Sequence, residues 1–417
     1  MPLIVQKFGG TSVASAEKIH RAARRAVKAR LDGYDVVLVV SAMGKTTDTL
    51  IALAREVTPR PPRREMDMLL TTGEQVSIAL MAMAIDAAGH RAISLTGGQL
   101  GLVTNGVHTE ARIQRISRDR IERELQAGNI VIVAGFQGID ERGEITTLGR
   151  GASDTTAAAL AAVLGAETCE IYTDVDGVYT TDPRIEPHAR KLDVIGYDEM
   201  LEMAGAGAKV MHSRAIEFGK KFQVPIHVRS SLTDAPGTLI MAETPGMEDI
   251  VVRGVTLQEN LATVVLIGVP NTPGMAATVF AEIARHHIVV DDIIQNIYDG
   301  GNVANIGFST RQTEMGRVRE LGQQLASKYG FRDTEVDENV CKVSVVGIGM
   351  RTHSGVASRV FQTLADAKIN IHSISTSEIV IGCIIHQADG HRAVQALHAA
   401  FELDRPESTS APASPPA

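Results

Sequence analysis

Lys7, Gly9 and Gly10 are the first residues of this chain whose types and spacing could do chemistry. The run Leu3–Gln6 predicts a short buried strand, and the two glycines predict a turn at which the backbone can approach a ligand closely. A helix that starts next would direct its free N–H groups and positive dipole end toward the same point. Lys7 adds a full positive charge, so the segment could bind nucleotide phosphates or could be an ordinary tight turn.

A second glycine-rich stretch, residues 147–156, precedes an alanine-rich helix. Ser153 or Asp154 can cap that helix, and Gly151 lets the loop fold against a ligand. Arg150 offers a planar guanidinium that can bind a carboxylate with two hydrogen bonds. The stretch is therefore either a carboxylate-binding loop or a capped helix that follows a surface loop, with Arg150 in solvent.

Three further polar residues follow predicted strands or begin predicted helices. Thr47 could bind a substrate through its hydroxyl, and Glu74 could accept a hydrogen bond from an ammonium group, a contact that burial would strengthen. Ser41 ends the predicted strand Val36–Ser41. Each also has a structural explanation, because Ser41 can simply end a strand and Glu74 can be a carboxylate that the dipole favours at a helix start.

The stretch Tyr172–Arg184 is dense in Asp, Gly and Pro and follows a predicted strand. It is either a well-formed turn or part of a nucleotide pocket, for which the candidates are Thr173, Asp174, Tyr179, Asp182 and Arg184. Lys209 is either a phosphate contact or a solvated helix lysine.

The elements that must position these residues alternate along the first 243 residues. The predicted strands are Leu3–Gln6, Val36–Ser41, Ala92–Leu95, Ile130–Ala134, Glu170–Thr173 and Pro225–Val228, rich in Val and Ile. The predicted helices between them include Ala16–Leu31, Ser77–Ala88 and Arg118–Ala127, followed by Gly33, Gly89 and Gly128 at left-handed ends. This alternation predicts an α/β domain with a mostly parallel sheet, in which ligands bind at the carboxyl ends of the strands.

Composition restricts the class of protein. A net charge of -8 argues against a nucleic-acid or anionic-membrane partner, and no apolar run approaches the length of about 18 residues that a membrane span needs. The chain enters its first strand without a signal-peptide pattern. Its three separated cysteines indicate reduced thiols in a cytoplasmic protein.

The last third of the chain contains an internal repeat. Residues 244–260 are predicted to be a linker, and the tail 404–417 is predicted to be disordered. Gly274 and Gly355 lie 81 residues apart, as do Phe280 and Phe361. Two copies of a βαββαβ unit, residues 261–338 and 339–403, would form two small α+β modules.

Several motifs together resemble the aspartate kinases within the amino-acid kinase family. They are K-F-G-G-T-S-V from Lys7, S-A-M-G from Ser41, T-x-G-E ending at Glu74, L-G-R-G-x-S-D ending at Asp154, and T-D-V-D-G-V-Y-T-x-D-P-R from Thr173. The repeat resembles paired ACT domains. The resemblance implies an amino-acid kinase fold over residues 1–243 followed by two ACT modules.

This resemblance implies ATP-dependent phosphorylation of the side-chain carboxylate of L-aspartate, with Mg²⁺ bridging ATP oxygens and no metal-binding side chains of the protein's own. Lys7 would contact the transferring phosphoryl group, Asp154 would orient Lys7 or fix the substrate, and the Gly9 and Gly10 amides would bind phosphates. The remaining nucleotide candidates are Thr173, Asp174, Tyr179, Asp182, Arg184 and Lys209. The substrate candidates are Ser41, Thr47, Glu74 for the ammonium, Arg150 for the α-carboxylate, Gly151 and Ser153.

Regulation is implied by the ACT resemblance. Lysine, threonine or both would inhibit by binding the modules, at Asn271, Gly274, Ala276, Asp291, Gln295, Val356, Asn370 and Ile371. Ser354 stands where the first module has Pro273, so the two modules need not bind effector equally. A homo-oligomer formed through the modules is expected, and Met247 marks where related short aspartate kinases initiate a small subunit.

Three other classes of protein remain to be weighed. Kinases of this family acting on acetylglutamate or UMP would share the Lys7–Gly10 features, but not the loop with Arg150 together with two ACT modules. A non-catalytic amino-acid sensor should have lost the charges at Lys7, Glu74, Arg150 and Asp154, and all four are present. A nicotinamide-dependent dehydrogenase would need a dinucleotide fingerprint, which the sequence lacks.

Overall fold

The fold comes from a computed structural model, which describes all residues except 209, 243–250, 352–354 and 406–417. The chain divides into two compact units. The first comprises Met1–Val178, Lys191–Ala204 and Lys209–Met247, and the second comprises Tyr179–Arg190, Gly205–Ala208 and Glu248–Ala417. Two short segments before residue 243 therefore pack with the second unit, which differs from the single boundary expected from the sequence.

The first unit is built on an eight-stranded sheet in the order β10-β12-β11-β9-β1-β2-β6-β3. Only the β11–β12 pair is antiparallel, which confirms the mostly parallel sheet. All six predicted strands belong to it. The strands are β1 (Leu3–Phe8), β2 (Asp35–Val40), β3 (Ala92–Leu95), β6 (Ile130–Ala134), β9 (Thr168–Thr173), β10 (Val194–Gly196), β11 (Ile226–Ser230) and β12 (Thr238–Met241).

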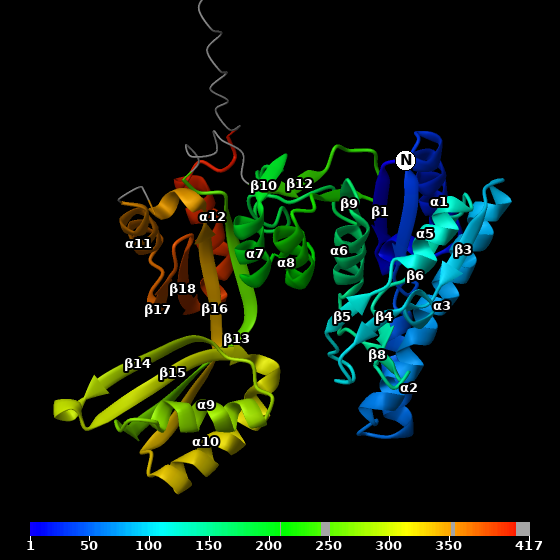
Figure 1. The fold of residues 1–417 in the computed structure, drawn as a ribbon. Helices are drawn as coiled ribbons and strands as arrows, with labels where there is room; N and C mark the ends of the chain where they lie inside the picture. The colour runs from blue at the N-terminus through cyan, green and yellow to red at the C-terminus, as the bar shows by residue number, and fades with distance from the viewer. Residues whose placement is uncertain (209, 243–250, 352–354, 406–417) are drawn as a thin grey trace, which may run out of the picture. The chain divides into compact units, whose positions relative to one another are not determined.

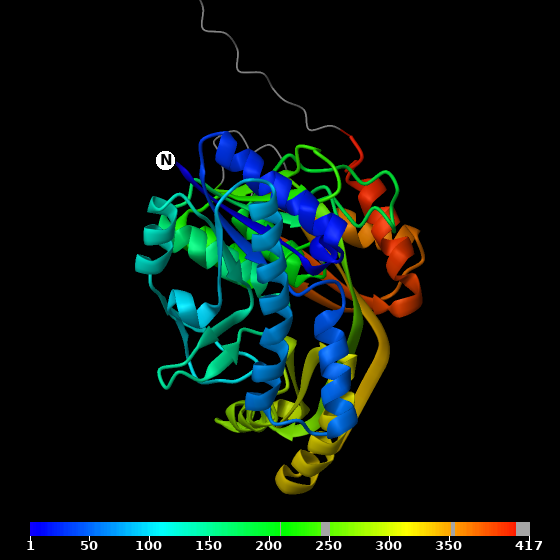
Figure 2. The same ribbon diagram turned by 90° about the vertical axis from the view of Figure 1, so that its right-hand side faces the viewer.

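Helices cover both faces of this sheet and thereby bury its central strands on both sides. One core joins alternate residues of β1, β2 and β6, such as Phe8, Leu38 and Ile132, to α1 (Ala16–Leu31) and α3 (Arg63–Ala87) (Figure 2). On the other face, α6 (Ser153–Leu164) packs against β1, β2 and β9 and against α8 (Ser213–Phe222) (Figure 1). The predicted left-handed glycines are confirmed, with φ of 98° at Gly33, 84° at Gly89 and 82° at Gly128.

Several elements of this unit were not expected from the sequence. A small four-stranded sheet has the order β5-β4-β7-β8. Its strands are β4 (Leu102–Thr104), β5 (Ile113–Ile116), β7 (Gln137–Ile139) and β8 (Ile145–Thr147). Helices α2 (Thr46–Val57), α4 (Gly97–Leu100) and α7 (Tyr197–Gly205) were not expected either, whereas α5 (Asp119–Gln126) confirms the predicted helix Arg118–Ala127.

Helix α3 is the one element of the described chain that is long and apolar enough to cross a membrane. The sequence analysis expected no such run. Half of its apolar window is buried inside the structure, where Ile78, Met81 and Ile85 pack in the core beneath the sheet. Packing against the sheet thus accounts for the apolar residues of α3.

The second unit contains a six-stranded sheet in the order β14-β15-β13-β16-β18-β17. The strands are β13 (Gly254–Pro270), β14 (Asp291–Tyr298), β15 (Val303–Arg311), β16 (Asp333–Val346), β17 (Ile371–Thr376) and β18 (Val380–His386). Its helices are α9 (Met275–Arg285), α10 (Met315–Tyr329), α11 (Val356–Asp366) and α12 (Gly390–Ala400). Gly274 and Gly355 precede α9 and α11 with φ of 91° and 100°, so the repeat is visible in the backbone.

The two modules share their two long strands. Residues 261–267 of β13 pair with 333–340 of β16 in the first module, whereas residues 254–258 pair with 342–346 in the second. The second module therefore takes its fourth strand from a segment that precedes the first module. The expected linker 244–260 differs accordingly, because residues 254–260 are strand, while 244–250 lie outside the described residues.

Candidate functional site

A pocket of about 280 Å³ opens at the carboxyl ends of β1 and β2 in the first unit. Parallel sheets place their ligand sites at this edge. Nine of the residues expected from the sequence line it, namely Lys7, Gly10, Ser41, Thr47, Glu74, Arg150, Gly151, Ser153 and Asp154. These residues come from β1, α3, α6 and the segments that follow β2 and β8, so the fold brings together four separate parts of the sequence.

Lys7 and Asp154 form the charged centre of this pocket. The Lys7 Nζ lies 2.6 Å from the Asp154 Oδ1, and the two side chains are only 11% and 9% exposed. The other carboxylate oxygen of Asp154 accepts a hydrogen bond from the His212 backbone N–H at 3.2 Å. Asp154 thus fixes the position of the Lys7 ammonium group while its own orientation is held from α8.

The Gly-Gly turn after β1 differs from what the sequence predicted. The Gly9 N–H donates to the Tyr172 carbonyl at 3.2 Å and is not directed at the pocket. Its lack of a side chain matters instead, because a Cβ there would lie 3.3 Å from the Lys7 Nζ. At Gly10 a Cβ would lie 2.7 Å from the Ala42 carbonyl oxygen, so the turn requires glycine.

The helix after this turn is also shorter than expected. Residues Gly10–Val13 form one turn of 3₁₀ helix, and α1 begins only at Ala16, where the Ser15 hydroxyl caps it by accepting from the Lys18 N–H. The dipole argument for phosphate binding therefore loses its basis, since α1 starts beyond the turn. Lys7 and Gly10 are the residues of this motif that line the pocket.

Glu74 presents a buried carboxylate to the pocket. It is 3% exposed, and its Oε1 accepts a hydrogen bond from the Ala42 N–H at 3.0 Å. Its Oε2 has no hydrogen-bond partner among the described residues. Burial raises the pKa of Glu74 to about 7, although the hydrogen bond from Ala42 opposes that shift. An ammonium group in the pocket would supply both the missing donor and the missing charge.

Arg150 lies at the mouth of the pocket on a loop bent by two left-handed glycines. Gly149 and Gly151 have φ of 93° and 77°. The Arg150 Nη2 lies 3.1 Å from the Asp48 Oδ1, and the two side chains are 70% and 61% exposed. Because an exposed pair of this kind contributes little energy, Arg150 can exchange Asp48 for another carboxylate at small cost.

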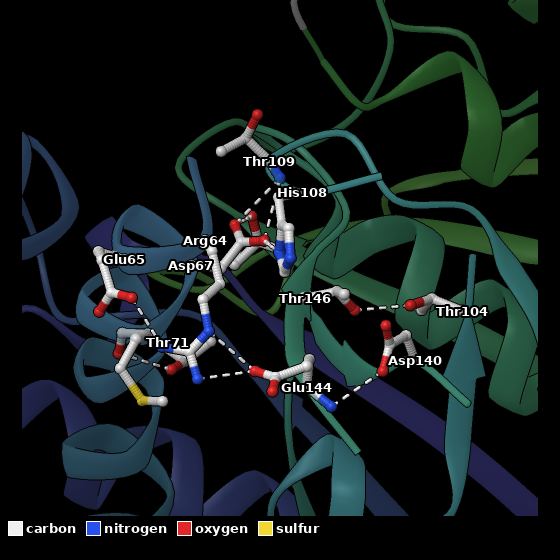
Figure 3. Close-up of polar contacts among 12 residues, drawn as sticks. Arg64, Glu65, Asp67, Thr71, Thr104, His108, Thr109, Asp140, Glu144 and Thr146 are labelled. Atoms are coloured by element: carbon white, nitrogen blue, oxygen red, sulfur yellow. Dashed lines mark hydrogen bonds and ion pairs between the residues drawn. The ribbon is translucent and has the colours of Figure 1, made fainter. Parts of the chain in front are cut away.

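A buried carboxylate on α3, Asp67, ties down the strand that leads into this loop (Figure 3). Asp67 is fully buried and accepts hydrogen bonds from the Thr147 hydroxyl at 2.5 Å and the Thr109 N–H at 3.1 Å. His108 Nδ1 lies 2.7 Å from its other oxygen. Asp67 precedes Glu74 by two helical turns, so one face of α3 holds both a pocket carboxylate and this tether.

The other side of the same loop is held from α8. The Arg214 guanidinium donates to the Leu148 carbonyl at 2.8 Å and to the Ala111 carbonyl at 3.4 Å. Leu148, Ala111 and Phe136 belong to one small apolar cluster beneath the loop. The backbone on which Arg150 stands is therefore fixed although the Arg150 side chain is exposed.

The residues expected to bind nucleotide fall into two groups. Thr173 and Asp174 end β9 in the first unit, where the Thr173 hydroxyl donates to the Asp174 Oδ1 at 3.1 Å. Tyr179, Asp182 and Arg184 belong to the second unit. Arg184 and Asp182 pair with each other at 2.6 Å. None of these five lines the pocket of about 280 Å³, and Lys209 lies outside the described residues.

Four residues that line the pocket were not predicted as site residues, namely Ala42, Gly44, Asp48 and Phe136. Ala42 and Gly44 belong to the S-A-M-G motif that starts at Ser41, and Asp48 follows the predicted Thr47. Phe136 lies two residues beyond the end of β6 and has a left-handed φ of 71°, so its position after a predicted strand was an available signal. The tethering residues Asp67 and Arg214 were also missed, because their partners are distant in the sequence.

The expected effector residues are distributed unevenly between the modules. In the first module, the Asn271 Nδ2 donates to the Gly301 carbonyl at 2.7 Å and the Gln295 amide lies 3.4 Å from the Asn271 Oδ1. Asp291 lies 3.7 Å from the Lys342 Nζ. Two further residues belong to the first module, Gly274 at the start of α9 and Ala276 at the edge of its core. In the second module, Asn370 is exposed, whereas Val356 and Ile371 pack in or against the core.

Known families match both parts of the chain. The model of the amino acid kinase family matches residues 2–230, and the model of the ACT domain matches residues 343–401. Aspartate kinase Ask_LysC of Stutzerimonas stutzeri (strain A1501) is 48% identical over 412 residues, which are 99% of this chain and 100% of that protein.

Solved structures agree with these matches. The structure of E. coli aspartokinase III with aspartate and ADP, in the R-state, is 28% identical with a TM-score of 0.81 and covers 95% of this chain and 99% of its own. The structure of the same enzyme with lysine and aspartate, in the T-state, is 27% identical with a TM-score of 0.74 and covers 96% and 99%. Matched over nearly its whole length, this chain belongs to the aspartate kinases, a branch of the amino acid kinase family.

Proposed function

We propose that this chain transfers the γ-phosphoryl group of ATP to the side-chain carboxylate of L-aspartate, giving 4-phospho-L-aspartate and ADP. The observation that carries the proposal is the combination in one pocket of the Lys7–Asp154 pair, the unpartnered Glu74 oxygen and Arg150. A homologous structure that holds aspartate and ADP supports it.

The pocket offers complementary contacts to an α-amino acid. Glu74 would bind the ammonium group and Arg150 the α-carboxylate, with hydrogen bonds from Ser41, Thr47 and Ser153. These contacts would leave the side-chain carboxylate of aspartate free to react. That carboxylate has a pKa near 4, so it is ionised at neutral pH and needs no general base.

Catalysis would then rest on position and charge. Two anions must approach each other, and negative charge on the transferring phosphoryl group must be stabilised. Lys7 would stabilise this charge, and Asp154 would hold the Lys7 ammonium in place through their 2.6 Å contact. Because both side chains are largely buried, their charges act through a medium of low polarity and are stronger than in water.

ATP and Mg²⁺ fit the donor groups that the chain offers. Mg²⁺ commonly binds through substrate phosphates and one or two carboxylates, and no cluster of three metal-ligating side chains occurs among the described residues. Bound Mg²⁺ would neutralise charge on the ATP phosphates. The residues proposed for the nucleotide are Lys7, Gly10, Thr173, Asp174, Tyr179, Asp182, Arg184 and Lys209.

Regulation by lysine, threonine or both through the ACT modules is part of the proposal. The complex of E. coli aspartokinase III with lysine in the T-state supports lysine as an effector. Homo-oligomers through the modules, a location in the cytoplasm and a small subunit that starts near Met247 are further proposals. The shared strands β13 and β16 make both modules one folding unit, which favours their acting together.

Formation of aspartyl hydroxamate tests the reaction directly. The full chain is incubated with L-aspartate, Mg-ATP and hydroxylamine, and with glutamate or acetylglutamate in place of aspartate. UMP, whose phosphorylated product cannot form a hydroxamate, is tested by release of ADP. ATP-dependent hydroxamate with aspartate alone is the expected result. Product only with another acceptor, or ATP binding without any product, would contradict the assignment.

A further inference from the structure

A second, larger cavity of about 760 Å³ lies on the sheet face that carries α1, beside that helix. Residues of β1, β9 and β11 form its floor, and α1 forms one wall. No described residue lines both this cavity and the substrate pocket. Its volume lies within the range of about 300–1,000 Å³ that is typical of small-molecule sites.

The floor of this cavity is a buried polar network with two open positions. The Glu170 carboxylate accepts hydrogen bonds from the Gln6 amide at 2.9 Å and from Arg229 at 2.8 Å. Gln6 is 2% exposed, yet its Oε1 has no partner in the described chain, and the same holds for the Arg229 Nε. One buried acceptor and one buried donor without a partner therefore belong to side chains that line the same cavity.

Unpartnered buried polar atoms are rare, because each lacks a hydrogen bond that water would otherwise supply. The substrate pocket shows the same feature at the Glu74 Oε2. In that pocket we attribute the open position to a ligand group. Two of the ten such atoms in the described chain belong to side chains that line the cavity beside α1, which makes this cavity a candidate for a second site.

The wall adds uncompensated positive charge. Arg24 and Lys28 lie one turn apart on α1, both are exposed, and neither has a hydrogen bond or ion pair within the described residues. By contrast, Arg21 pairs with Glu17 at 3.4 Å, and Arg25 pairs with Asp234 at 3.1 Å. Five cationic and three acidic side chains line the cavity, although the chain as a whole carries a net charge of -8. Two like charges at this spacing disfavour the helix unless an anion compensates them.

We propose that this cavity binds a phosphate monoester that carries hydroxyl groups, a ligand of the size of a sugar phosphate. Arg24 and Lys28 hold the phosphate, whose double negative charge matches the excess of two cationic side chains over acidic ones. A ligand hydroxyl donates to the Gln6 Oε1, and a ligand oxygen accepts from the Arg229 Nε.

The site is connected to the catalytic residues through the backbone. Gln6 directly precedes Lys7 in β1, and Tyr172, whose carbonyl accepts from the Gly9 N–H, also lines the cavity. The Tyr172 ring stacks on Phe8 with ring centroids 4.7 Å apart. A ligand that orders this floor would therefore also affect the position of the Gly9–Gly10 turn that follows Lys7.

Isothermal titration of the full chain with ribose 5-phosphate tests the site, with ribose and inorganic phosphate as comparison ligands. The key variant is Arg24→Glu with Lys28→Glu, which alters only exposed side chains and should fold normally. Its matched control is Arg60→Glu with Arg63→Glu, two exposed residues away from the cavity. We expect the first variant to bind ribose 5-phosphate at least about tenfold more weakly, and the control to bind within about twofold of the unmodified chain.

Lys7→Ala separates this site from the substrate pocket and should leave binding of ribose 5-phosphate unchanged. Absence of binding to the unmodified chain would overturn the proposal. So would equal binding to the Arg24/Lys28 variant, or binding that disappears in Lys7→Ala. Equal affinity for inorganic phosphate would overturn the assignment of a hydroxylated ligand. None of these results depends on whether the chain phosphorylates aspartate.

Discussion

Lys7 and Asp154 are the two residues whose contact is most directly tied to the chemistry. Lys7→Ala should lower kcat by on the order of 10²-fold or more, because it removes the charge that stabilises the transferring phosphoryl group. KM for aspartate should change much less, since Glu74 and Arg150 are expected to bind the substrate. Initial rates of hydroxamate formation at several aspartate concentrations measure both constants.

A control is needed because Lys7→Ala leaves Asp154 buried without its partner. Lys7→Met keeps most of the side-chain volume but also leaves Asp154 without its partner, so thermal unfolding monitored by circular dichroism must show whether either variant is folded. A folded variant with nearly full kcat would remove Lys7 from the reaction.

Glu74 predicts a pH dependence of aspartate binding. Burial raises the pKa of Glu74 to about 7, and only the ionised carboxylate can attract the substrate ammonium. KM for aspartate should therefore rise roughly tenfold as the pH falls from about 8 to about 6, where the groups of free aspartate do not titrate. In Glu74→Gln, KM should be high and nearly independent of pH over this interval.

The raised pKa of Glu74 also predicts how the stability of the ligand-free protein depends on pH. A native pKa of about 7, above the ordinary 4.5, means that the folded protein binds more protons than the unfolded chain in this interval. The contribution of Glu74 to the free energy of unfolding is therefore lost as the pH rises from about 4.5 to about 7. As the pH is raised over this interval, the free energy of unfolding of Glu74→Gln should increase relative to that of the unmodified chain. If the difference between the two free energies stays constant over the interval, Glu74 does not titrate there.

At the scale of elements, the tether between α3 and β8 should control substrate affinity from outside the pocket. Asp67→Ala removes the acceptor for the Thr147 hydroxyl and the Thr109 N–H, so the loop that carries Arg150 loses its anchor. We expect KM for aspartate to rise on the order of tenfold with KM for ATP nearly unchanged, because the loss acts through Arg150. Hydroxamate kinetics with each substrate varied in turn measure the two constants.

Asp67→Asn is the conservative comparison, because its amide oxygen can still accept from Thr147, and it should recover most of the affinity. Arg64→Ala is the matched control on the same helix. Arg64 is exposed and pairs with Glu144 at 2.7 Å, whereas the hydrogen bonds of Asp67 run to His108, Thr109 and Thr147 (Figure 3). An equal loss of kcat and of both affinities in Asp67→Ala would indicate a general loss of structure instead.

These elements also show how far the sequence could predict the structure. The six strands were found within two residues at each end because doubly buried strands are continuous apolar runs, such as Val36–Val40. Short strands β4, β5, β7 and β8 were not found, because each has only three or four residues and contains Thr, Gln or Arg, so none forms a continuous apolar run.

The site was predictable to the extent that its residues follow strands or capped helices. Lys7, Glu74 and Arg150 stand in motifs that carry local signals of glycine, capping and charge. Asp67 and Arg214 do not, since a buried carboxylate or guanidinium acquires its role from partners 80 and 66 residues away in sequence. The free amide assumed for Gly9 was wrong for the same reason, because its acceptor Tyr172 belongs to a distant strand.

At the scale of the whole chain, the repeat was visible in sequence but its strand exchange was not. A spacing of 81 residues reveals two similar units, yet it cannot show that residues 254–258 complete the second one. The long strands β13 and β16 run through both modules and give a continuous backbone connection along which a change in one module can reach the other. One effector site could therefore be sufficient to regulate the chain.

The structure favours the first module as that site. Gln295 is exposed, Asn271 is half-buried and the two lie within hydrogen-bonding distance of each other, whereas Val356 and Ile371 of the second module pack in or against its core. Gln295→Ala should therefore weaken inhibition by lysine or threonine by about tenfold or more while leaving the uninhibited rate unchanged. Asn370→Ala, an equally exposed position in the second module, is the matched control and should remain sensitive.

Binding measurements complete this test, because coupling between two sites must be reciprocal. Titration of the effector should give a weaker affinity in the presence of aspartate and ATP analogue than in their absence, by the same factor with which the effector weakens aspartate binding. Gln295→Ala should weaken effector binding itself by about tenfold or more, so both shifts should appear only at correspondingly higher effector concentrations. If that variant binds effector normally but is no longer inhibited, Gln295 belongs to the coupling between modules and pocket, and the effector site must be sought elsewhere in the second unit.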